Sequence, residues 1–112
     1  MENLIKMLKR HEGAETHVYM CTEDRYTIGV GRNVDPRGGL GLSEDEIDYL
    51  LSNDIVRCVK EINKEYIWFG DLNTVRTEAV ISAFFCLGAT KFRAFRKMIQ
   101  AFERADYKEA AT

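Results

Sequence analysis

The feature that most constrains the fold is a periodic apolar run between residues 43 and 63. Ser43 followed by Glu46 forms a capping box, a pattern typical of the start of a helix. Apolar side chains then recur at helical spacing on one face, at Ile47, Leu50, Leu51, Ile55, Val56, Val59 and Ile62. We therefore predict one long helix from residue 43 to about residue 63, with different structures on its two sides.

The N-terminal side combines a short helix with a small sheet. Apolar positions at helical offsets predict a helix over residues 2–10, with Gly13 placed to end it. Residues 18–20 and 25–28 are rich in β-branched and aromatic side chains, which favours strands. The polar residues 22–24 between them indicate a hairpin turn.

The rest of the chain contains one long loop and several helices. Residues 32–42 hold the only proline, so we predict a loop there, the most flexible-looking stretch of the chain. We also expect a third short strand within it near residues 32–34. The aromatic stretch 66–70 ends the long helix, and we expect Trp68 to fill a core there. Further helical segments are expected at residues 75–87, ending at Gly88, at residues 92–102, and from residue 106 to 111.

This order of elements predicts an α+β fold, because the strands gather in one part of the chain and helices alone follow. A chain of 112 residues that is 46% hydrophobic is long enough for one domain with a single modest core. We assign residues 13–42 to a β lobe, residues 43–63 to a linking helix, and residues 1–12 and 64–112 to a helical lobe.

Composition excludes several function classes. A formal net charge of -2 gives no general attraction to nucleic acid or to anionic membranes. No apolar run reaches the length of a membrane span, and the N-terminus lacks a signal-peptide pattern, so we expect synthesis in the cytoplasm. Cys21, Cys58 and Cys86 lie far apart and form no CxxC pair, which suggests neither a disulfide framework nor a metal site. No cofactor is implied.

Residues 12–31 bring together the side chains that catalysis would need. Glu12 follows the first helix, Cys21 lies at the hairpin, and Thr27 begins a run with glycines at positions 29 and 31. Glycines let a backbone or a ligand approach closely. An acid near a second reactive group is what glycoside hydrolysis requires, since one group protonates the leaving oxygen and the other handles water or the anomeric carbon.

The spacing of these residues resembles that of the phage-type lysozymes, a family of muramidases. Glu12-Gly13 is followed by Cys21 after eight residues and by Thr27 after five more. The resemblance covers nearly the whole chain, and weaker support comes from Ser43-Glu44-Asp45-Glu46, Phe84-Phe85-Cys86-Leu87-Gly88 and Asp106-Tyr107-Lys108-Glu109-Ala110-Ala111. It implies a lysozyme-like fold in which a long helix joins a small hairpin lobe to a helical lobe.

The resemblance also implies an activity, cleavage of the β-1,4 bond between N-acetylmuramic acid and N-acetylglucosamine in peptidoglycan. Glu12 would be the general acid. Cys21 would replace the aspartate of many relatives and act on water or on carbon, and Thr27 would hold that water. Gly31, Arg32 and Cys86 would bind substrate. Whether the reaction inverts or retains configuration stays open, because a thiol stands where a carboxylate is usual.

The chain departs from the family pattern at several positions. Arg32 stands where many relatives have histidine, and by analogy we predict a salt bridge between Arg32 and Asp54. Cys86 replaces an amide side chain that reaches toward the substrate in relatives. Relatives continue beyond the position of Thr112 with an arginine that packs against the catalytic glutamate, so we expect either self-association through the uncovered helical lobe or marginal stability.

Three functional hypotheses follow. The first is an endolysin that hydrolyses the glycan strand of peptidoglycan to lyse the host, made in the host cytoplasm and released to the periplasm through holin pores. The second is a lysozyme-like module that binds peptidoglycan or a partner protein with weak or no catalysis. The third is a thiol-based redox or metal protein, based on Cys21 with His17 nearby.

Overall fold

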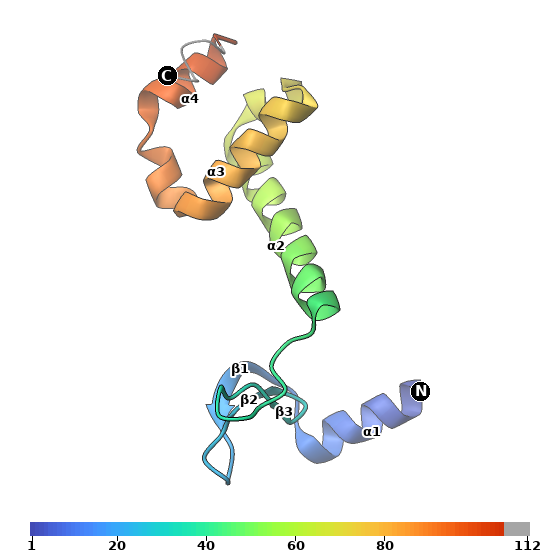
Figure 1. Ribbon diagram of the computed structural model, residues 1–112. Coiled ribbons are helices and arrows are strands. Elements are labelled where there is room, and N and C mark those ends of the chain that lie inside the picture. The colour runs from blue at the N-terminus through green and yellow to red at the C-terminus, as the bar shows by residue number, and fades with distance from the viewer. Residues whose placement is uncertain (107–112) are drawn as a thin grey trace. The chain divides into compact units, whose positions relative to one another are not determined.

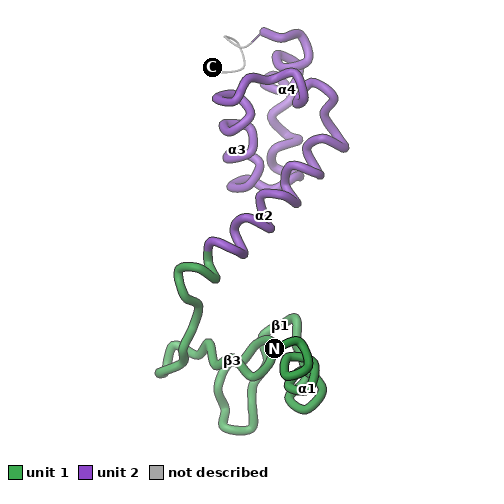
Figure 2. Tube along the Cα trace, turned by 90° about the vertical axis from the view of Figure 1, so that its right-hand side faces the viewer, with its two compact units in different colours: residues 1–47 green, residues 48–112 purple. Residues whose placement is uncertain are grey.

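The computed structural model describes residues 1–106, and the contacts of the chain group it into two compact units. Unit 1 comprises Met1–Ile47 and unit 2 comprises Asp48–Thr112 (Figure 2). The boundary falls close to the start of the predicted long helix. Contacts place residues 1–12 with the sheet in unit 1, whereas we expected them in the helical lobe; the lobe boundaries and the single-domain organisation stay predictions.

Unit 1 contains one helix and a three-stranded antiparallel sheet (Figure 1). Helix α1 (Glu2–Glu12) ends where Gly13 adopts a φ of 81°, a left-handed conformation that favours glycine. The strands are β1 (Glu15–Met20), β2 (Tyr26–Gly29) and β3 (Arg32–Asn33). Both the predicted hairpin and the third strand are therefore confirmed.

The central strand of the sheet is β2, which places Thr27 between two neighbours. In the register, Thr27 pairs with Tyr19 of β1 on one side and with Asn33 of β3 on the other. The register of β1 and β2 shifts between Glu15 and Tyr19, an irregularity that alters the local twist of the strand. Thr27 is only 4% exposed as a result of its central position.

Helix α2 (Glu44–Glu65) corresponds to the long periodic run in the sequence. The predicted capping box forms reciprocally: the Glu46 N–H donates to Ser43 Oγ at 3.2 Å, and the Ser43 N–H donates to Glu46 Oε1 at 2.9 Å. These two bonds satisfy backbone donors that the first turn of a helix leaves without partners. The prediction of this helix from residue 43 to about residue 63 is confirmed.

Unit 2 continues with helical segments of different lengths that enclose an aromatic core. They are the 3-10 helix η1 (Ile67–Asp71), helix α3 (Thr74–Arg93) and helix α4 (Arg96–Glu103). Asn73 Oδ1 accepts from the Arg76 N–H at 2.9 Å and so caps α3. Gly88 has non-helical backbone angles inside α3, which confirms the predicted end of the first helical run at that residue.

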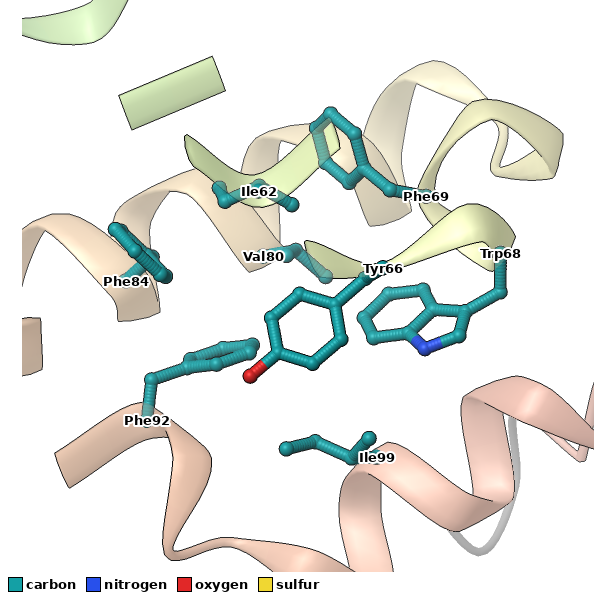
Figure 3. Close-up of a cluster of buried hydrophobic side chains, with 8 residues drawn as sticks. All are labelled: Ile62, Tyr66, Trp68, Phe69, Val80, Phe84, Phe92 and Ile99. Atoms are coloured by element: carbon teal, nitrogen blue, oxygen red, sulfur yellow. The ribbon is translucent and has the colours of Figure 1, made fainter. Parts of the chain in front are cut away.

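The core of unit 2 consists of side chains from all of these segments (Figure 3). Trp68 is buried and stacks on Phe102 with ring centroids 4.6 Å apart, as expected for a residue that fills a core. The other buried members are Ile62, Tyr66, Phe69, Val80, Phe84, Phe92 and Ile99.

Helices and a small antiparallel sheet make the fold α+β, as predicted. The helical segment expected from residue 106 to 111 falls almost entirely outside the described residues. Within the part of the chain that the structure describes, no helix has both the length and the apolar character needed to cross a bilayer.

Candidate active site

Cys21 lies directly after β1, at the first position of the turn that leads into β2. The turn is closed by two backbone hydrogen bonds of 3.0 Å, from the Cys21 N–H to the Arg25 carbonyl and from the Asp24 N–H to the Cys21 carbonyl. Asp24 has a φ of 63°, a left-handed conformation that costs free energy for any residue other than glycine. The turn is therefore held in a specific conformation by its surroundings.

The environment of the Cys21 side chain favours its ionised form. Hydrogen bonds from the Glu23 backbone and then from the Arg25 backbone lower the pKa of the thiol, with a smaller contribution from the Thr27 side chain. Partial burial and the Glu23 carboxylate oppose this lowering of the pKa. Because the thiolate is the reactive form of cysteine, the turn provides a base or nucleophile at a lower pH than a free thiol would.

Thr27 contacts the same turn from β2. Its hydroxyl donates to the Arg25 carbonyl at 2.9 Å, the same carbonyl that accepts from the Cys21 N–H. A hydroxyl has one proton and two lone pairs, so it donates to one partner at a time while still accepting from water. The structure thus brings Cys21 and Thr27 together, as the sequence predicted for neighbouring strands.

Glu12 is the last residue of α1, and two residues separate it from β1. Its side chain is exposed, and within residues 1–106 it has neither a hydrogen-bond partner nor an ion-pair partner. The structure does not join Glu12 to Cys21 or Thr27 by any such interaction. The role of Glu12 as the general acid stays a prediction.

Gly31 and Arg32 lie at the turn between β2 and β3. Gly31 has a φ of 71°, a backbone conformation that favours glycine at this position. The Arg32 guanidinium donates to the Gly41 carbonyl at 3.0 Å and to Glu46 Oε1 at 2.7 Å. These bonds engage Arg32 with its own unit, and its predicted contact with substrate is untested.

The partner predicted for Arg32 needs correction. Arg32 forms its salt bridge with Glu46, in the first turn of α2, whereas Asp54 pairs with Arg57 on the same helix. Glu46 lies only a few residues after the loop that follows β3, so its carboxylate is nearby in the chain as well as in space. The same bond to Arg32, followed by those from Ser43, lowers the Glu46 pKa to about 2.

Cys86 lies on α3 in unit 2, and its side chain is exposed. It lines a groove of about 330 Å³ between α2 and α3, together with mainly apolar residues. These residues are Leu51, Ile55, Glu78, Ile81, Ser82 and Phe85. The predicted role of Cys86 in substrate binding is untested.

One buried acid was missed by reasoning from the sequence. Asp35 is 1% exposed and forms a salt bridge with Arg37, in the loop that we expected to be flexible. The Arg37 side chain, then the Tyr26 backbone N–H, hold the pKa of Asp35 well below its ordinary range. The stretch Asp35-Pro36-Arg37 carries a local signal, because an aspartate before a turn often accepts from the backbone two residues later.

The third hypothesis based a redox or metal role on Cys21 with His17 nearby. In the described part of the chain, no group of three histidine, cysteine, aspartate or glutamate side chains is arranged to hold a metal ion. The His17 Nδ1 atom is hydrogen-bonded to Thr16 Oγ1 at 2.9 Å, and the three cysteines are free thiols.

A comparison with models of protein families matches most of the chain. Residues 9–112 match the family model described as phage lysozyme. The matched range includes Glu12, Cys21 and Thr27, as well as Arg32 and Cys86. Among curated proteins, no sequence matches the chain.

Proposed function

The chain belongs to the phage lysozyme family, and we propose that it is an endolysin-type muramidase that hydrolyses the β-1,4 bond between N-acetylmuramic acid and N-acetylglucosamine. Family membership itself indicates a glycoside hydrolase that acts on peptidoglycan. The particular bond and the roles of individual residues belong to the proposal.

The observation that carries the proposal is the pair of Cys21 and Thr27. The Cys21 thiol has a lowered pKa because backbone N–H groups of its own turn, and more weakly Thr27, stabilise the thiolate. A buried threonine hydroxyl beside a thiolate can orient a water molecule against it. This is the chemistry that the second group of a glycoside hydrolase must supply.

In the proposed reaction, Glu12 donates its proton to the glycosidic oxygen as the bond from this oxygen to the anomeric carbon breaks. In the inverting course, the Cys21 thiolate takes a proton from a water held by Thr27, and the water oxygen bonds to the anomeric carbon. In the retaining course, the Cys21 sulfur bonds to that carbon first, and a water activated by Glu12 later displaces it.

A second candidate function is peptidoglycan binding with weak or no cleavage. The observation that favours it is the exposed side chain of Glu12, since a general acid is usually kept protonated by a desolvated or electrostatically tuned site.

The proposed setting follows that of an endolysin. The protein would be made in the host cytoplasm, pass through holin pores and act on the wall in the periplasm. Self-association through the helical unit stays a prediction, and the exposed apolar side chains of Leu51, Ile55 and Phe85 in unit 2 are the observation that supports it.

The proposal is tested by replacing Glu12 with glutamine and measuring the clearing of a peptidoglycan suspension. We expect the rate of clearing by Glu12→Gln to fall by at least about 100-fold, because glutamine cannot donate the required proton. Glu2→Gln, at the other end of the same helix, is the matched control and should clear at the wild-type rate. Equal clearing by Glu12→Gln and wild type would refute the mechanism, and wall binding by wild type without clearing would support the second candidate.

A further inference from the structure

The loop between β3 and α2 contains an ionic group that the proposed mechanism does not use. Asp35 is among the most deeply buried side chains of the chain, although it carries a charge. A buried charge is retained only where it is paired and hydrogen-bonded, because its removal from water is otherwise too costly. The contacts of Asp35 show which parts of the molecule its burial holds in place.

Each carboxylate oxygen of Asp35 accepts two hydrogen bonds. Asp35 Oδ1 accepts from the backbone N–H of Arg37 at 2.8 Å and from Arg37 Nε at 2.9 Å. Asp35 Oδ2 accepts from Arg37 Nη2 and from the backbone N–H of Tyr26, both at 2.9 Å. The bidentate pair with Arg37 restricts orientation as well as distance. The bond to Tyr26 fixes the residue that precedes Thr27.

Arg37 extends the same network to the turn that contains Cys21. Its Nη2 atom also donates to the Asp24 carbonyl at 2.6 Å. Asp24 is the turn residue with a left-handed backbone, and its own N–H donates to the Cys21 carbonyl. A backbone conformation of this kind persists where neighbouring groups hold it. Arg37 therefore holds the turn that begins at Cys21.

The Asp35 loop is itself held rigidly against this region. Asn33 Oδ1 accepts from the Asp35 N–H at 2.9 Å, and the Asp35 carbonyl accepts from the Gly39 N–H at 2.7 Å. A Cβ atom on Gly39 would lie 2.6 Å from Asp35 N and closer still to Asn33 Oδ1, well inside normal contact distance. Only glycine fits at position 39 without displacing Asp35.

We infer that Asp35 and Arg37 are positioning residues, which hold the turn at Cys21 and the start of β2 and thereby fix Cys21 and Thr27 relative to one another. Asp35 acts on the Thr27 side through Tyr26, and Arg37 acts on the Cys21 side through Asp24. The effect on catalysis rests on the proposed muramidase function. The effect on the Cys21 thiol does not, because it can be measured without substrate.

The test is the pH dependence of Cys21 alkylation by iodoacetamide, followed by peptide mass mapping so that Cys58 and Cys86 do not contribute. In the wild type, the midpoint should lie below the value of about 8.5 for a free thiol. In Arg37→Gln it should rise by about one pH unit, because the turn loses the bond that orients its N–H groups. Clearing of peptidoglycan should slow by about tenfold or more.

Two further variants separate positioning from other effects. Arg93→Gln removes a bidentate pair with Glu65 in unit 2 and the same charge, and it should change neither the Cys21 midpoint nor the clearing rate. Gly39→Ala changes no charge but displaces Asp35, and it should raise the midpoint in the same direction as Arg37→Gln. Thermal unfolding shows whether each variant is folded. If Arg37→Gln does not fold, the Cys21 midpoint of Gly39→Ala is the measurement that decides.

An unchanged Cys21 midpoint in Arg37→Gln, or an equal rise in Arg93→Gln, would overturn the inference. The outcome is separate from that of the proposed function. A wild-type protein that fails to clear peptidoglycan but whose Cys21 midpoint depends on Arg37 would refute the proposed function and retain the positioning role. If the wild-type protein clears peptidoglycan but the Cys21 midpoint is the same in Arg37→Gln, the proposed function is retained and the positioning role is refuted.

Discussion

Units 1 and 2 are stabilised by different kinds of interaction. In unit 2, the buried side chains form a hydrophobic cluster with several aromatic contacts, such as the edge contact of Tyr66 and Phe92 at 5.5 Å. In residues 1–47, all of which the structure describes, the buried side chains are Thr27 and Asp35, both polar. Unit 2 therefore depends on the burial of apolar surface, and unit 1 depends on hydrogen bonds and ion pairs.

This difference has a consequence for function, because Cys21 and Thr27 lie in the unit without a hydrophobic core. A small sheet without a core has little apolar burial to offset the entropy of ordering its chain. Charge-assisted hydrogen bonds, which are stronger than neutral ones, replace part of that stabilisation at Asp35 and Glu46. The groups that hold the candidate site are thus ionic, and they should respond to pH.

The largest effect is expected from removing an aromatic side chain in the core of unit 2. Phe92 is fully buried against Tyr66 and Phe84, so Phe92→Ala should lower the free energy of unfolding of unit 2 by about 3–5 kcal/mol. Urea titration followed by the fluorescence of Trp68, the only tryptophan, measures this change.

The matched control for the core is Phe85→Ala, since Phe85 lies on the same helix but is 45% exposed. It should cost about 1 kcal/mol or less. The amide signals of β2 in unit 1 should persist in Phe92→Ala at urea concentrations that unfold unit 2. If the β2 signals disappear at the same urea concentration as the Trp68 fluorescence transition, the two units unfold as one. That result would contradict the proposed difference between the units.

The next effect is the response of unit 1 to acid. Arg32 and Ser43 lower the Glu46 pKa to about 2, from an ordinary value of 4.5, and Arg37 and Tyr26 lower the pKa of Asp35 further. Both carboxylates are ionised in the folded state at a pH where the unfolded chain binds protons. Their stabilising contribution is present above a pH of about 4.5 and is lost as the pH falls through about 2.

Amide signals from the two units, recorded by NMR as the pH is lowered, measure this response. The β2 and β3 signals should weaken before those of α3, because protonation breaks the ion pairs of unit 1 and leaves the apolar core of unit 2 in place. Glu46→Gln should shift the loss to higher pH. Glu44→Gln should leave it unchanged, since Glu44 has no ion pair in the described chain. Loss of the α3 signals before those of β2 and β3 would contradict the proposed difference between the two units.

The smallest effect is expected at the start of α2, the helix that begins in unit 1 and continues through unit 2. Ser43→Ala removes the hydroxyl that accepts from the Glu46 N–H, and it should lower the free energy of unfolding by about 1 kcal/mol. Ser52, exposed within the same helix, offers the control, because Ser52→Ala removes no cap and alanine favours a helix.

Hydrogen exchange of the amides in the first turn of α2 measures the effect of Ser43→Ala. Exchange at Glu46 should accelerate, while the unfolding transition of Trp68 should move little, because the core of unit 2 begins farther along the helix at Ile62. Equal exchange rates in Ser43→Ala and Ser52→Ala would show that the cap contributes nothing measurable.

The elements that sequence reasoning identified depend on neighbours a few residues apart. The capping box at Ser43 and Glu46, the end of α1 at Gly13 and the break at Gly88 are local events, because each involves one turn of backbone. The hairpin likewise follows from two stretches rich in β-branched and aromatic residues around a polar turn. The same local order placed Cys21 and Thr27 near one another.

The errors and omissions concern pairs of residues that are separated in the chain. Arg32 was assigned to Asp54, but it binds Glu46, because the path of the loop before α2 decides which acid reaches the guanidinium. Asp35 lies in the loop that we expected to be flexible, and its burial depends on Tyr26 and on the approach of Gly39. Neither arrangement follows from composition or period.

By itself, therefore, the sequence determined the α+β class, the family and the positions of the candidate acid, thiol and hydroxyl. Tertiary structure decided what surrounds them: backbone groups that lower the pKa of Cys21, a buried Asp35 linked to the turn through Arg37, and the salt bridge of Glu46 with Arg32. The physical reason is that helix and strand formation depend on local periodicity, whereas hydrogen bonds and pKa values depend on distances between atoms that only folding brings together.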